Sequence, residues 1–394
     1  MLETLRAADP ARSLDRAVSI ADLRRLAARR LPRTVFDFIE GGATDEVTRR
    51  DNEAAFGDWM LVPRVAVDVS RRSTVTDIVG RPSRLPFLLA PTGLAGFFWP
   101  GGEIAAATAA AEAGIPFCLS TNSVASLETV AHAVPDSDRW FQLYILRDRE
   151  WSDQLVRRAK QANYRVLCIT VDLAVNGRRE RDMRNGFTMP LRPRAATVLD
   201  LARRPRWLVG TLLSPPKFGN FERAGASTSF TSVAQHVSSL FDPSVTWDDI
   251  ARTRDLWGGP VVIKGIIHPD DADKAIAIGA DAVMVSNHGG RQLDGVPAAI
   301  TALPEIVSAV GGRAQVILDG GVRRATDILK SIALGASACS VGRSFLWGLC
   351  AAGQRGVRKS IDILGDELDN AMTLLGTPAI EDVSAAHVTA RHAR

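Results

Sequence analysis

The chain has 394 residues, of which 46% are hydrophobic and 23% charged. This balance is typical of a folded globular protein with a large core. The net charge of +4 is small for this length, and the arginines are interspersed with acidic residues, so the composition argues against a nucleic-acid partner. Four widely spaced cysteines without CxxC spacing predict no metal site and favour a reduced, intracellular setting. No apolar run reaches 18 residues and no apolar leader begins the chain, so we expect neither a membrane-spanning helix nor a signal peptide.

Residues 1–84 precede any regular pattern, and we expect them to form a helical, then irregular, N-terminal extension that packs on the main domain. From residue 85, short apolar runs alternate with longer amphipathic segments. The helical segments are 102–114, 152–163, 269–280 and 325–336, and the last two carry Gly279 and Gly335 as expected C-caps. The runs that predict strands are 85–91, 116–121, 140–145, 165–172, 260–265, 281–287, 314–321 and 338–343.

Eight strands alternating with helices predict an α/β protein with a parallel (β/α)8 barrel, the TIM barrel, over residues 85–375. A long insertion, 173–246, interrupts the alternation after the fourth strand, and 376–394 forms a C-terminal tail. Barrels of this kind place their active residues at the C-terminal ends of the strands.

Polar residues collect at these predicted strand ends. The segments DGGVRR (319–324) and VGR (341–343) follow strands seven and eight, where glycine N–H groups and a nearby cation often bind phosphate in this fold. We therefore expect a phosphorylated cofactor or substrate. The polar residues at the strand ends are Thr92, Ser120, Gln142, Tyr144, Thr170, Asp172, Lys264, His288, Arg291, Asp319, Arg323, Gly342 and Arg343.

Several motifs together resemble the FMN-dependent 2-hydroxy-acid dehydrogenases and oxidases, a family that includes glycolate oxidase and L-lactate dehydrogenase. They are SNHGGRQLDG (286–295), LDGGVRRATD (318–327), IKG (263–265), FQLY (141–144) and TVD (170–172). The segments 90–103 and 172–187 are most similar to the (S)-mandelate dehydrogenase branch. The resemblance extends from about Ser19 to Leu375. It implies FMN as cofactor and oxidation of an (S)-2-hydroxy acid to the 2-keto acid.

The segment 286–295 contains residue types that suit this reaction. The oxidation removes two electrons and two protons, and an imidazole, which titrates near neutral pH, is a suitable base, so we assign that role to His288. Arg291 can hold the substrate carboxylate through two hydrogen bonds. Gly289 and Gly290 allow a tight turn beside the ligand, and we expect Asp294 to be structural.

The resemblance assigns further catalytic roles. Asp172 would pair with the histidine and stabilise its protonated form. Arg179 would be the second carboxylate-binding arginine, with Arg178 as the neighbouring alternative. Tyr144 would hydrogen-bond the substrate. Lys264 would stabilise negative charge on the reduced flavin ring.

The resemblance also implies two groups of cofactor-binding residues. The first contacts the flavin ring and ribityl chain, and the second binds the lower ribityl chain and phosphate. Gly93 belongs to the first group and favours a dehydrogenase, because several oxidases of the family have alanine there. The first group is Thr92, Gly93, Ser120, Gln142, Thr170, Lys264 and Ser286, and the second is Asp319, Gly321, Arg323, Gly342 and Arg343.

Two substrate-binding positions depart from the family pattern. Phe38 stands where the family usually has a tyrosine that contacts the substrate carboxylate, so binding would depend more on the arginines. Asn122 stands where glycolate oxidase has a tryptophan, which should open the pocket. We therefore expect a larger substrate, such as an aromatic or long-chain 2-hydroxy acid.

The insertion 173–246 resembles that of the membrane-associated mandelate and lactate dehydrogenases. Its segment 190–220 would bring basic and apolar side chains to anionic lipid, so we expect a cytoplasmic protein bound peripherally to the inner membrane face. Reduced FMN would then pass electrons to a quinone or other carrier. The alternatives are a lid that only covers the site, and a soluble oxidase that makes H2O2. We also expect a homotetramer. The lipid-facing candidates are Arg203, Arg204, Arg206, Trp207, Leu208, Val209, Leu212 and Leu213.

Two rival classes share part of this pattern. A flavin or nucleotide isomerase, or a nucleotide dehydrogenase, would share the phosphate end of the barrel but would give no reason for His288 and Arg291 in one turn. A catalytically inactive flavoprotein is hard to reconcile with the intact set of polar residues at the strand ends.

Overall fold

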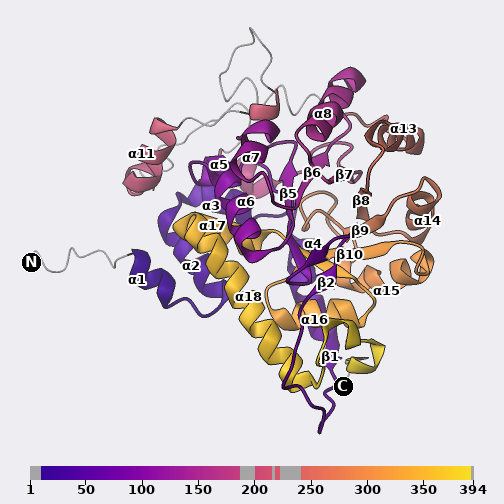
Figure 1. The fold of residues 1–394 in the computed structure, drawn as a ribbon. Helices are drawn as coiled ribbons and strands as arrows, with labels where there is room; N and C mark the ends of the chain where they lie inside the picture. The colour runs from indigo at the N-terminus through magenta and orange to yellow at the C-terminus, as the bar shows by residue number, and fades with distance from the viewer. Residues whose placement is uncertain (1–9, 187–199, 215–217, 222–240, 392–394) are drawn as a thin grey trace, which may run out of the picture.

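The computed structural model describes residues 10–186, 200–214, 218–221 and 241–391 (Figure 1). Its centre is a closed barrel of parallel strands, which confirms the predicted (β/α)8 fold. The strands are β4 (Phe87–Leu89), β5 (Phe117–Ser120), β6 (Arg139–Leu143), β7 (Val166–Thr170), β8 (Val261–Ile266), β9 (Ala282–Ser286), β10 (Gln315–Asp319) and β11 (Ala338–Val341). Each overlaps one of the predicted strand segments. They follow one another around the barrel in chain order, and β11 closes it against β4.

The barrel strands are buried on both faces, because helices cover the outside and side chains fill the inside. This explains their continuous apolar sequence. Ile78 and Val79, between the short strands β2 (Thr76–Asp77) and β3 (Pro82–Ser83), pack into the interior core with Trp140. Gln315, at the start of β10, accepts a hydrogen bond from the Val79 N–H group, so this hairpin closes the N-terminal end of the barrel.

The helices between the strands form the outer layer (Figure 1). The predicted helical segments all contain one, and Gly279 and Gly335 lie one residue beyond their C-caps with positive φ, as expected for glycine at this position. The helices are α5 (Ala95–Phe98), α6 (Gly102–Ala113), α7 (Leu127–Ala133), α8 (Arg149–Gln161), α13 (Trp247–Trp257), α14 (Pro269–Ala277), α15 (Ala299–Val310), α16 (Ala325–Ala333), α17 (Arg343–Ala352) and α18 (Gln354–Leu375).

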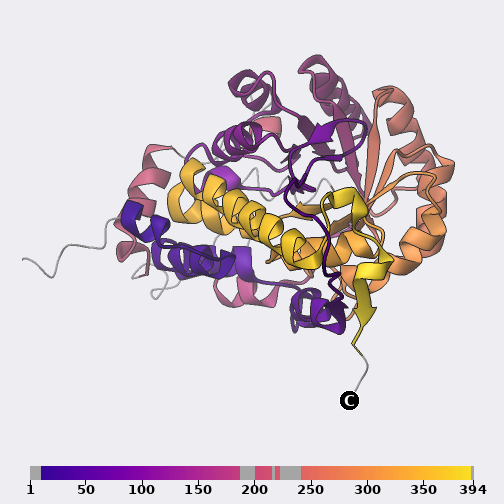
Figure 2. The ribbon, with the colours of Figure 1, turned by 60° about the horizontal axis from the view of Figure 1, so that its bottom comes forward.

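The N-terminal segment lies against the last helices of the chain. Figure 2 shows its indigo helices beside the yellow α17 and α18, and α2 packs against both. The strands β1 (Trp59–Leu61) and β12 (Val388–Ala390) pair antiparallel, which joins the segment to the C-terminal residues. The remaining elements here are α1 (Pro10–Asp15), α2 (Ile20–Arg30), α3 (Arg33–Glu40), α4 (Val47–Ala54), η1 (Ala55–Asp58), η3 (Ile380–Asp382) and η4 (Ala385–His387).

The insertion after β7 is described in parts, as α9 (Glu180–Arg184), α11 (Pro205–Leu213) and η2 (Gly219–Phe221). The prediction that Trp207 faces lipid is wrong, because its ring is buried edge-on against Phe97 with 5.5 Å between centroids. Arg204 is also turned inward in part, since its Nε donates to the Leu31 carbonyl.

Other parts of the predicted lipid-binding segment keep the expected exposure. Val209, Leu212 and Leu213 are 53%, 70% and 80% exposed. Residues 190–199 and 215–217, and the Arg206 side chain, lie outside the described residues. Among the helices that are described, none is long and apolar enough to cross a bilayer.

Candidate active site

The C-terminal ends of the strands surround a cavity of about 650 Å³, within the usual range for a small-molecule or cofactor site. Nearly all the predicted site residues line it. Asp172 and Ser286 instead stand behind the wall and contact residues that form it. The predicted residues on the wall are Phe38, Thr92, Gly93, Ser120, Asn122, Gln142, Tyr144, Thr170, Arg179, Lys264, His288, Arg291, Asp319, Gly321, Arg323, Gly342 and Arg343.

His288 lies between an acid and a phenol. Its Nδ1 is 2.9 Å from Asp172 Oδ1, and its Nε2 is 3.4 Å from the Tyr144 hydroxyl. A carboxylate at Nδ1 favours the tautomer with the proton there, which leaves the Nε2 lone pair toward the cavity. The residue has φ of +59°, an uncommon value for a side chain other than glycine. The hydrogen bond from its backbone N–H to Ser286 Oγ, 3.0 Å long, helps to hold this conformation.

The buried Asp172 carboxylate lies beside His288 and near the positive charge of Lys264. Burial alone would raise its pKa, but the electrostatic attraction to His288, the hydrogen bond with His288 and the charge of Lys264 lower the pKa below the ordinary value. Gly265 makes room for this acid, because a Cβ at that position would lie 2.7 Å from Asp172 Cβ. The carboxylate is therefore ionised at neutral pH and faces the imidazole.

Lys264 is fixed from two sides in the floor of the cavity. Its Nζ lies 2.8 Å from Ser286 Oγ and 2.8 Å from Asp319 Oδ2, and the Ser286 hydroxyl donates to the same Asp319 oxygen at 2.7 Å. Burial disfavours the ammonium, but the charges of Asp319 and Asp172 outweigh it and raise the lysine pKa. A fixed positive charge therefore lies at this wall.

Two arginines lie against the ring of Phe38. The Arg291 guanidinium is 4.9 Å from the ring centroid and that of Arg179 is 6.0 Å away. Arg291 Nη1 donates to the carbonyls of Phe38 and Gly41, at 2.7 and 2.9 Å. Its Nε and Nη2, and both Nη atoms of Arg179, make no hydrogen bond within the described residues, so these donors are available to a ligand.

This end of the cavity carries excess positive charge. Burial, and then the charges of Arg179 and Arg343, lower the pKa of Arg291 well below the ordinary value. Asp182 also lines the cavity, and burial raises its pKa to about 6 against the opposing effect of both substrate-site arginines. No described cation lies within ion-pair distance of it. An anionic ligand would relieve the repulsion between the two guanidinium groups.

At the end of the cavity where we expect phosphate, Arg323 and Arg343 are partly engaged by protein groups. Arg323 lies over the Trp347 ring, 4.7 Å from its centroid, and its Nη2 bonds Glu53 at 2.9 Å. Arg343 donates through Nε, Nη1 and Nη2 to the carbonyls of Ile39, Gly289 and Gly41. Only the second hydrogen on each Nη of Arg343 remains for a ligand, so this residue also fastens the N-terminal segment to the 288–290 turn.

The cavity fits FMN on the chemistry of its wall. Gln142 Nε2, Thr170 Oγ1, Asn122 Oδ1 and Arg323 Nε are buried and have no hydrogen-bond partner in the described part of the chain. Unpaired buried polar atoms are costly, and a polar ring and phosphate would satisfy them. Gly321, with φ of +78°, passes so close to Asn52 that a Cβ would lie 1.8 Å from its carbonyl oxygen. The backbone thus follows a path next to the phosphate cations that only glycine permits.

Several wall residues could not be predicted. Phe241 lies edge-on to the Tyr144 ring, with 5.3 Å between centroids, but it belongs to the insertion and no motif marks it. Asp182 did have a signal, because it lies three residues after Arg179 on a short helix, a spacing that brings the two to one face. The other unpredicted apolar residues on the wall are Ile39, Ala90, Pro91, Leu94, Phe98, Leu173, Met183, Phe218, Val322 and Leu346.

A parallel barrel with buried cations and unpaired polar atoms at its strand ends defines a site for a phosphorylated cofactor and a small acid. Comparison with known proteins agrees. The family model described as FMN-dependent dehydrogenase matches residues 27–390. The L-lactate dehydrogenase of Pseudomonas syringae is 43% identical over 372 residues, 93% of this chain and 97% of that protein. The L-lactate oxidase of Nostoc sp. is 43% identical over 372 residues, 94% of this chain and 97% of that protein.

A solved structure gives the same result. The crystal structure of the monotopic membrane protein (S)-mandelate dehydrogenase has a TM-score of 0.92 and 40% identity, over 95% of this chain and all of that one. The chain belongs to the FMN-dependent dehydrogenase family, and its cofactor is FMN. The prediction of an FMN-dependent 2-hydroxy-acid dehydrogenase from the sequence is confirmed at this level.

Proposed function

We propose that the protein oxidises an (S)-2-hydroxy acid to the 2-keto acid with His288 as the base. The substrate loses the hydrogen on C2 and the hydroxyl hydrogen, in total two electrons and two protons, and His288 Nε2 takes one of the protons. Bound FMN would supply the acceptor for the two electrons and the remaining proton. The observation that carries the proposal is the position of this imidazole, held by Asp172 at 2.9 Å and facing the cavity that both arginines line.

The acid that holds His288 also stabilises the product of proton transfer. When Nε2 gains a proton, the imidazolium lies beside the ionised Asp172 carboxylate, which faces the positive charge across the hydrogen bond at Nδ1. Tyr144 contributes a neutral hydroxyl, because burial and the charge of Asp172 raise its pKa above the ordinary value. We assign it a hydrogen bond to the substrate hydroxyl oxygen.

Arg179 and Arg291 bind the substrate carboxylate in this proposal. The N–H groups that have no partner in the described part of the chain, the burial of both side chains and their mutual repulsion all favour an anion between them. Lys264 would hold the negative charge that develops on the reduced flavin ring. Thr92, Gly93, Ser120, Gln142 and Thr170 would bind the ring and the ribityl chain.

Ser286, Asp319 and the phosphate-end residues complete the proposed FMN site. Ser286 would act through Lys264 and Asp319 rather than by touching the cofactor, because its hydroxyl is fully committed to them and to the His288 N–H group. Gly321, Arg323, Gly342 and Arg343 would receive the phosphate and the end of the ribityl chain.

We propose a hydrophobic substrate side chain. Aromatic rings line the cavity, among them Phe38 and, next to Tyr144, Phe241, and the small Asn122 leaves space where a tryptophan would fill the pocket. Such a wall gains free energy from burying a phenyl or alkyl group, whereas glycolate offers nothing to bury.

We also propose that reduced FMN passes electrons to a quinone at the inner face of the cytoplasmic membrane, from a homotetramer. The exposed side chains of Val209, Leu212 and Leu213 on α11 support membrane contact, and a similar protein is a monotopic membrane protein. A soluble oxidase that gives H2O2 is the second candidate, because the Nostoc relative is named an oxidase.

An anaerobic screen tests the reaction and the substrate together. FMN-loaded protein is mixed with glycolate, lactate, mandelate and a long-chain 2-hydroxy acid, and the loss of flavin absorbance is followed. We expect faster bleaching by mandelate or the long-chain acid than by glycolate. A clear preference for glycolate would remove the hydrophobic-pocket proposal, and bleaching by none of them would remove the function.

A further inference from the structure

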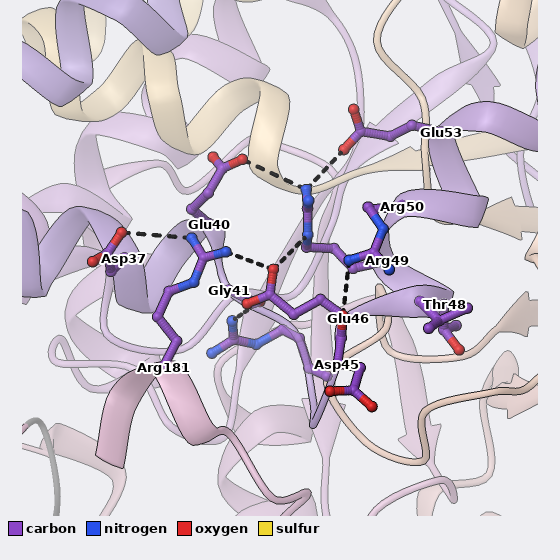
Figure 3. Close-up of polar contacts among 12 residues, drawn as sticks. Asp37, Glu40, Gly41, Asp45, Glu46, Thr48, Arg49, Arg50, Glu53 and Arg181 are labelled. Carbon is purple, nitrogen blue, oxygen red and sulfur yellow. Dashed lines mark hydrogen bonds and ion pairs between the residues drawn. The ribbon is translucent and has the colours of Figure 1, made fainter. Parts of the chain in front are cut away.

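An ion-paired cluster joins the N-terminal segment to α9 (Figure 3). Arg181 Nη1 lies 3.5 Å from Asp37 Oδ1, and Asn185 Nδ2 donates to Asp37 Oδ2 at 2.8 Å. These contacts fix α9 on α3. Phe38 follows Asp37 in the sequence, and Arg179 lies two residues before Arg181. The contacts between α3 and α9 therefore lie next to the Phe38 ring and the Arg179 guanidinium, which meet in the cavity.

Glu46 is the second carboxylate that Arg181 reaches. Arg181 Nη2 lies 2.6 Å from Glu46 Oε2, and Arg49 Nε lies 3.2 Å from the same oxygen (Figure 3). The Glu46 side chain is only 10% exposed, and that of Arg181 is 32% exposed. Glu46 has φ of +58°, a left-handed conformation that these contacts hold in place.

The backbone around Glu46 touches both arginine-bearing segments. We call residues 41–46 the bridging turn. Its Thr44 N–H donates to the Arg178 carbonyl at 2.8 Å, and its Ala43 N–H donates to the Gly290 carbonyl at 2.8 Å. Each acceptor immediately precedes one of the two substrate-site arginines in the sequence. The bridging turn therefore fixes the backbone immediately before Arg179 and Arg291.

The charges continue from the turn toward the phosphate end. Arg49 Nη1 lies 3.6 Å from Glu40 and 3.7 Å from Glu53, and Glu53 bonds Arg323. These ion pairs connect Arg181 to Arg323. Arg181 and Glu46 lie at the end of the series near the two substrate-site arginines, so a change at either residue affects that end. Removing one partner would leave the other charge partly buried and unpaired, which favours rearrangement of the turn.

We propose that Arg181 and Glu46 are positioning residues for the substrate carboxylate. Their ion pair fixes the bridging turn on α9, and thereby sets the separation of Arg179 and Arg291. Neither residue lines the cavity, so both act through those arginines. The proposal rests on the proposed function, in which the two arginines bind the substrate carboxylate.

Binding of a carboxylate that cannot reduce the flavin provides the test. Phenylglyoxylate, the keto product of mandelate oxidation, is titrated into FMN-loaded protein and followed by the flavin difference spectrum. We expect Glu46→Gln and Arg181→Gln each to weaken binding at least tenfold, with flavin content and the saturating rate of anaerobic reduction within twofold of wild type. Arg181→Lys should be intermediate, because an ammonium keeps the charge but cannot hold Asp37 and Glu46 with two separate nitrogens.

Two further variants separate positioning from general destabilisation. Arg72→Gln breaks the ion pair between Arg72 and Asp369. The Arg72 side chain is 26% exposed, which is similar to Arg181, but neither residue of this pair lines the cavity. This variant should leave phenylglyoxylate binding unchanged. The double variant Glu46→Gln/Arg181→Gln should lose less affinity than the two single losses combined, because the Arg181–Glu46 pair is removed in all three variants.

Wild-type binding in Glu46→Gln and Arg181→Gln would overturn the proposal, as would equal losses in Arg72→Gln. If wild-type protein neither binds phenylglyoxylate nor is reduced by any 2-hydroxy acid, the proposed function fails and this inference fails with it. If wild type binds and the variants bind equally well, only the positioning role fails.

Discussion

The ring of Phe38 lies against both arginines that we assign to the substrate carboxylate, where the resemblance to the family leads one to expect a tyrosine. The ring keeps the stacking contact with Arg291 but offers the substrate no hydroxyl. In the proposed function the guanidinium groups would therefore provide the hydrogen bonds at this end of the cavity.

Phe38→Tyr should tighten carboxylate binding. A new hydrogen bond to a charged group contributes about 1 kcal/mol or more, so we expect the Kd of phenylglyoxylate to fall about fivefold. The control is Phe38→Leu, which removes the ring and should weaken binding, because the stacking on Arg291 is lost. An unchanged Kd in Phe38→Tyr would show that the added hydroxyl does not reach the ligand.

Asp182 gives carboxylate binding a pH dependence. Burial raises its pKa to about 6, and the charged groups facing it are Arg291, Arg179, Arg181 and Asp37. Above this pH its negative charge competes with the substrate for the arginines, and below it the neutral acid does not. Phenylglyoxylate should therefore bind more tightly as the pH falls from 7.5 to 5.5.

Asp182→Asn tests whether Asp182 is the group that causes this pH dependence. The variant should bind more tightly at pH 7.5, and the difference from wild type should shrink as the pH falls through 6. The folded-state pKa lies above the value of 3.8 for an exposed aspartate, so ionised Asp182 costs folding free energy at neutral pH, roughly 1–3 kcal/mol. A difference in Kd that does not change with pH would exclude Asp182 as the titrating group.

At the scale of the element, α11 has two faces with different tasks. Trp207 anchors the helix on Phe97, whereas Val209, Leu212 and Leu213 are exposed. Positions three and four apart share a helix face, so these three side chains form one apolar strip. The strip, and not the tryptophan, is the part of the helix that can enter a lipid interface.

Replacing these three residues by serine should abolish co-sedimentation with anionic liposomes and leave anaerobic flavin reduction intact. Trp207 stays in place, so the fold of the helix is preserved. Val65→Ser is the matched control, because this residue is 87% exposed but lies far along the chain from α11. Intact protein that ignores the liposomes, and whose reduced flavin reacts rapidly with O2, would identify a soluble oxidase instead.

The strands of the barrel were predictable because both of their faces are buried. A barrel strand is apolar on both faces, so segments such as 281–287 are recognisable from composition alone. The bridging turn and the hairpin that carries Ile78 were not predictable, because their conformations depend on contacts with distant residues, such as Gly290 for the turn and Gln315 for the hairpin. Trp207 was assigned to the wrong face because an exposed strip and a buried anchor are adjacent in one apolar run.

At the scale of the whole molecule, the barrel explains why the motifs could be combined into one site. Parallel strands end at the same rim, so polar residues from β4 to β11 meet there although the chain separates them by over 200 residues. Residues of the insertion and the N-terminal segment follow no such rule. Phe241, Asp182 and Glu46 lie outside the barrel strands, and only the three-dimensional structure brings them to the site region.

The rate of flavin reduction by the two enantiomers of mandelate tests the central claim most directly. FMN-loaded wild type and His288→Ala are mixed anaerobically with (S)- or (R)-mandelate in a stopped-flow instrument. We predict rapid bleaching of wild type by the (S) acid and not by the (R) acid, and a loss of about 10²- to 10⁴-fold in His288→Ala, whose flavin content is unchanged. Near-normal reduction of His288→Ala, or equal reduction by both enantiomers, would contradict a site in which this histidine takes the proton from one oriented substrate.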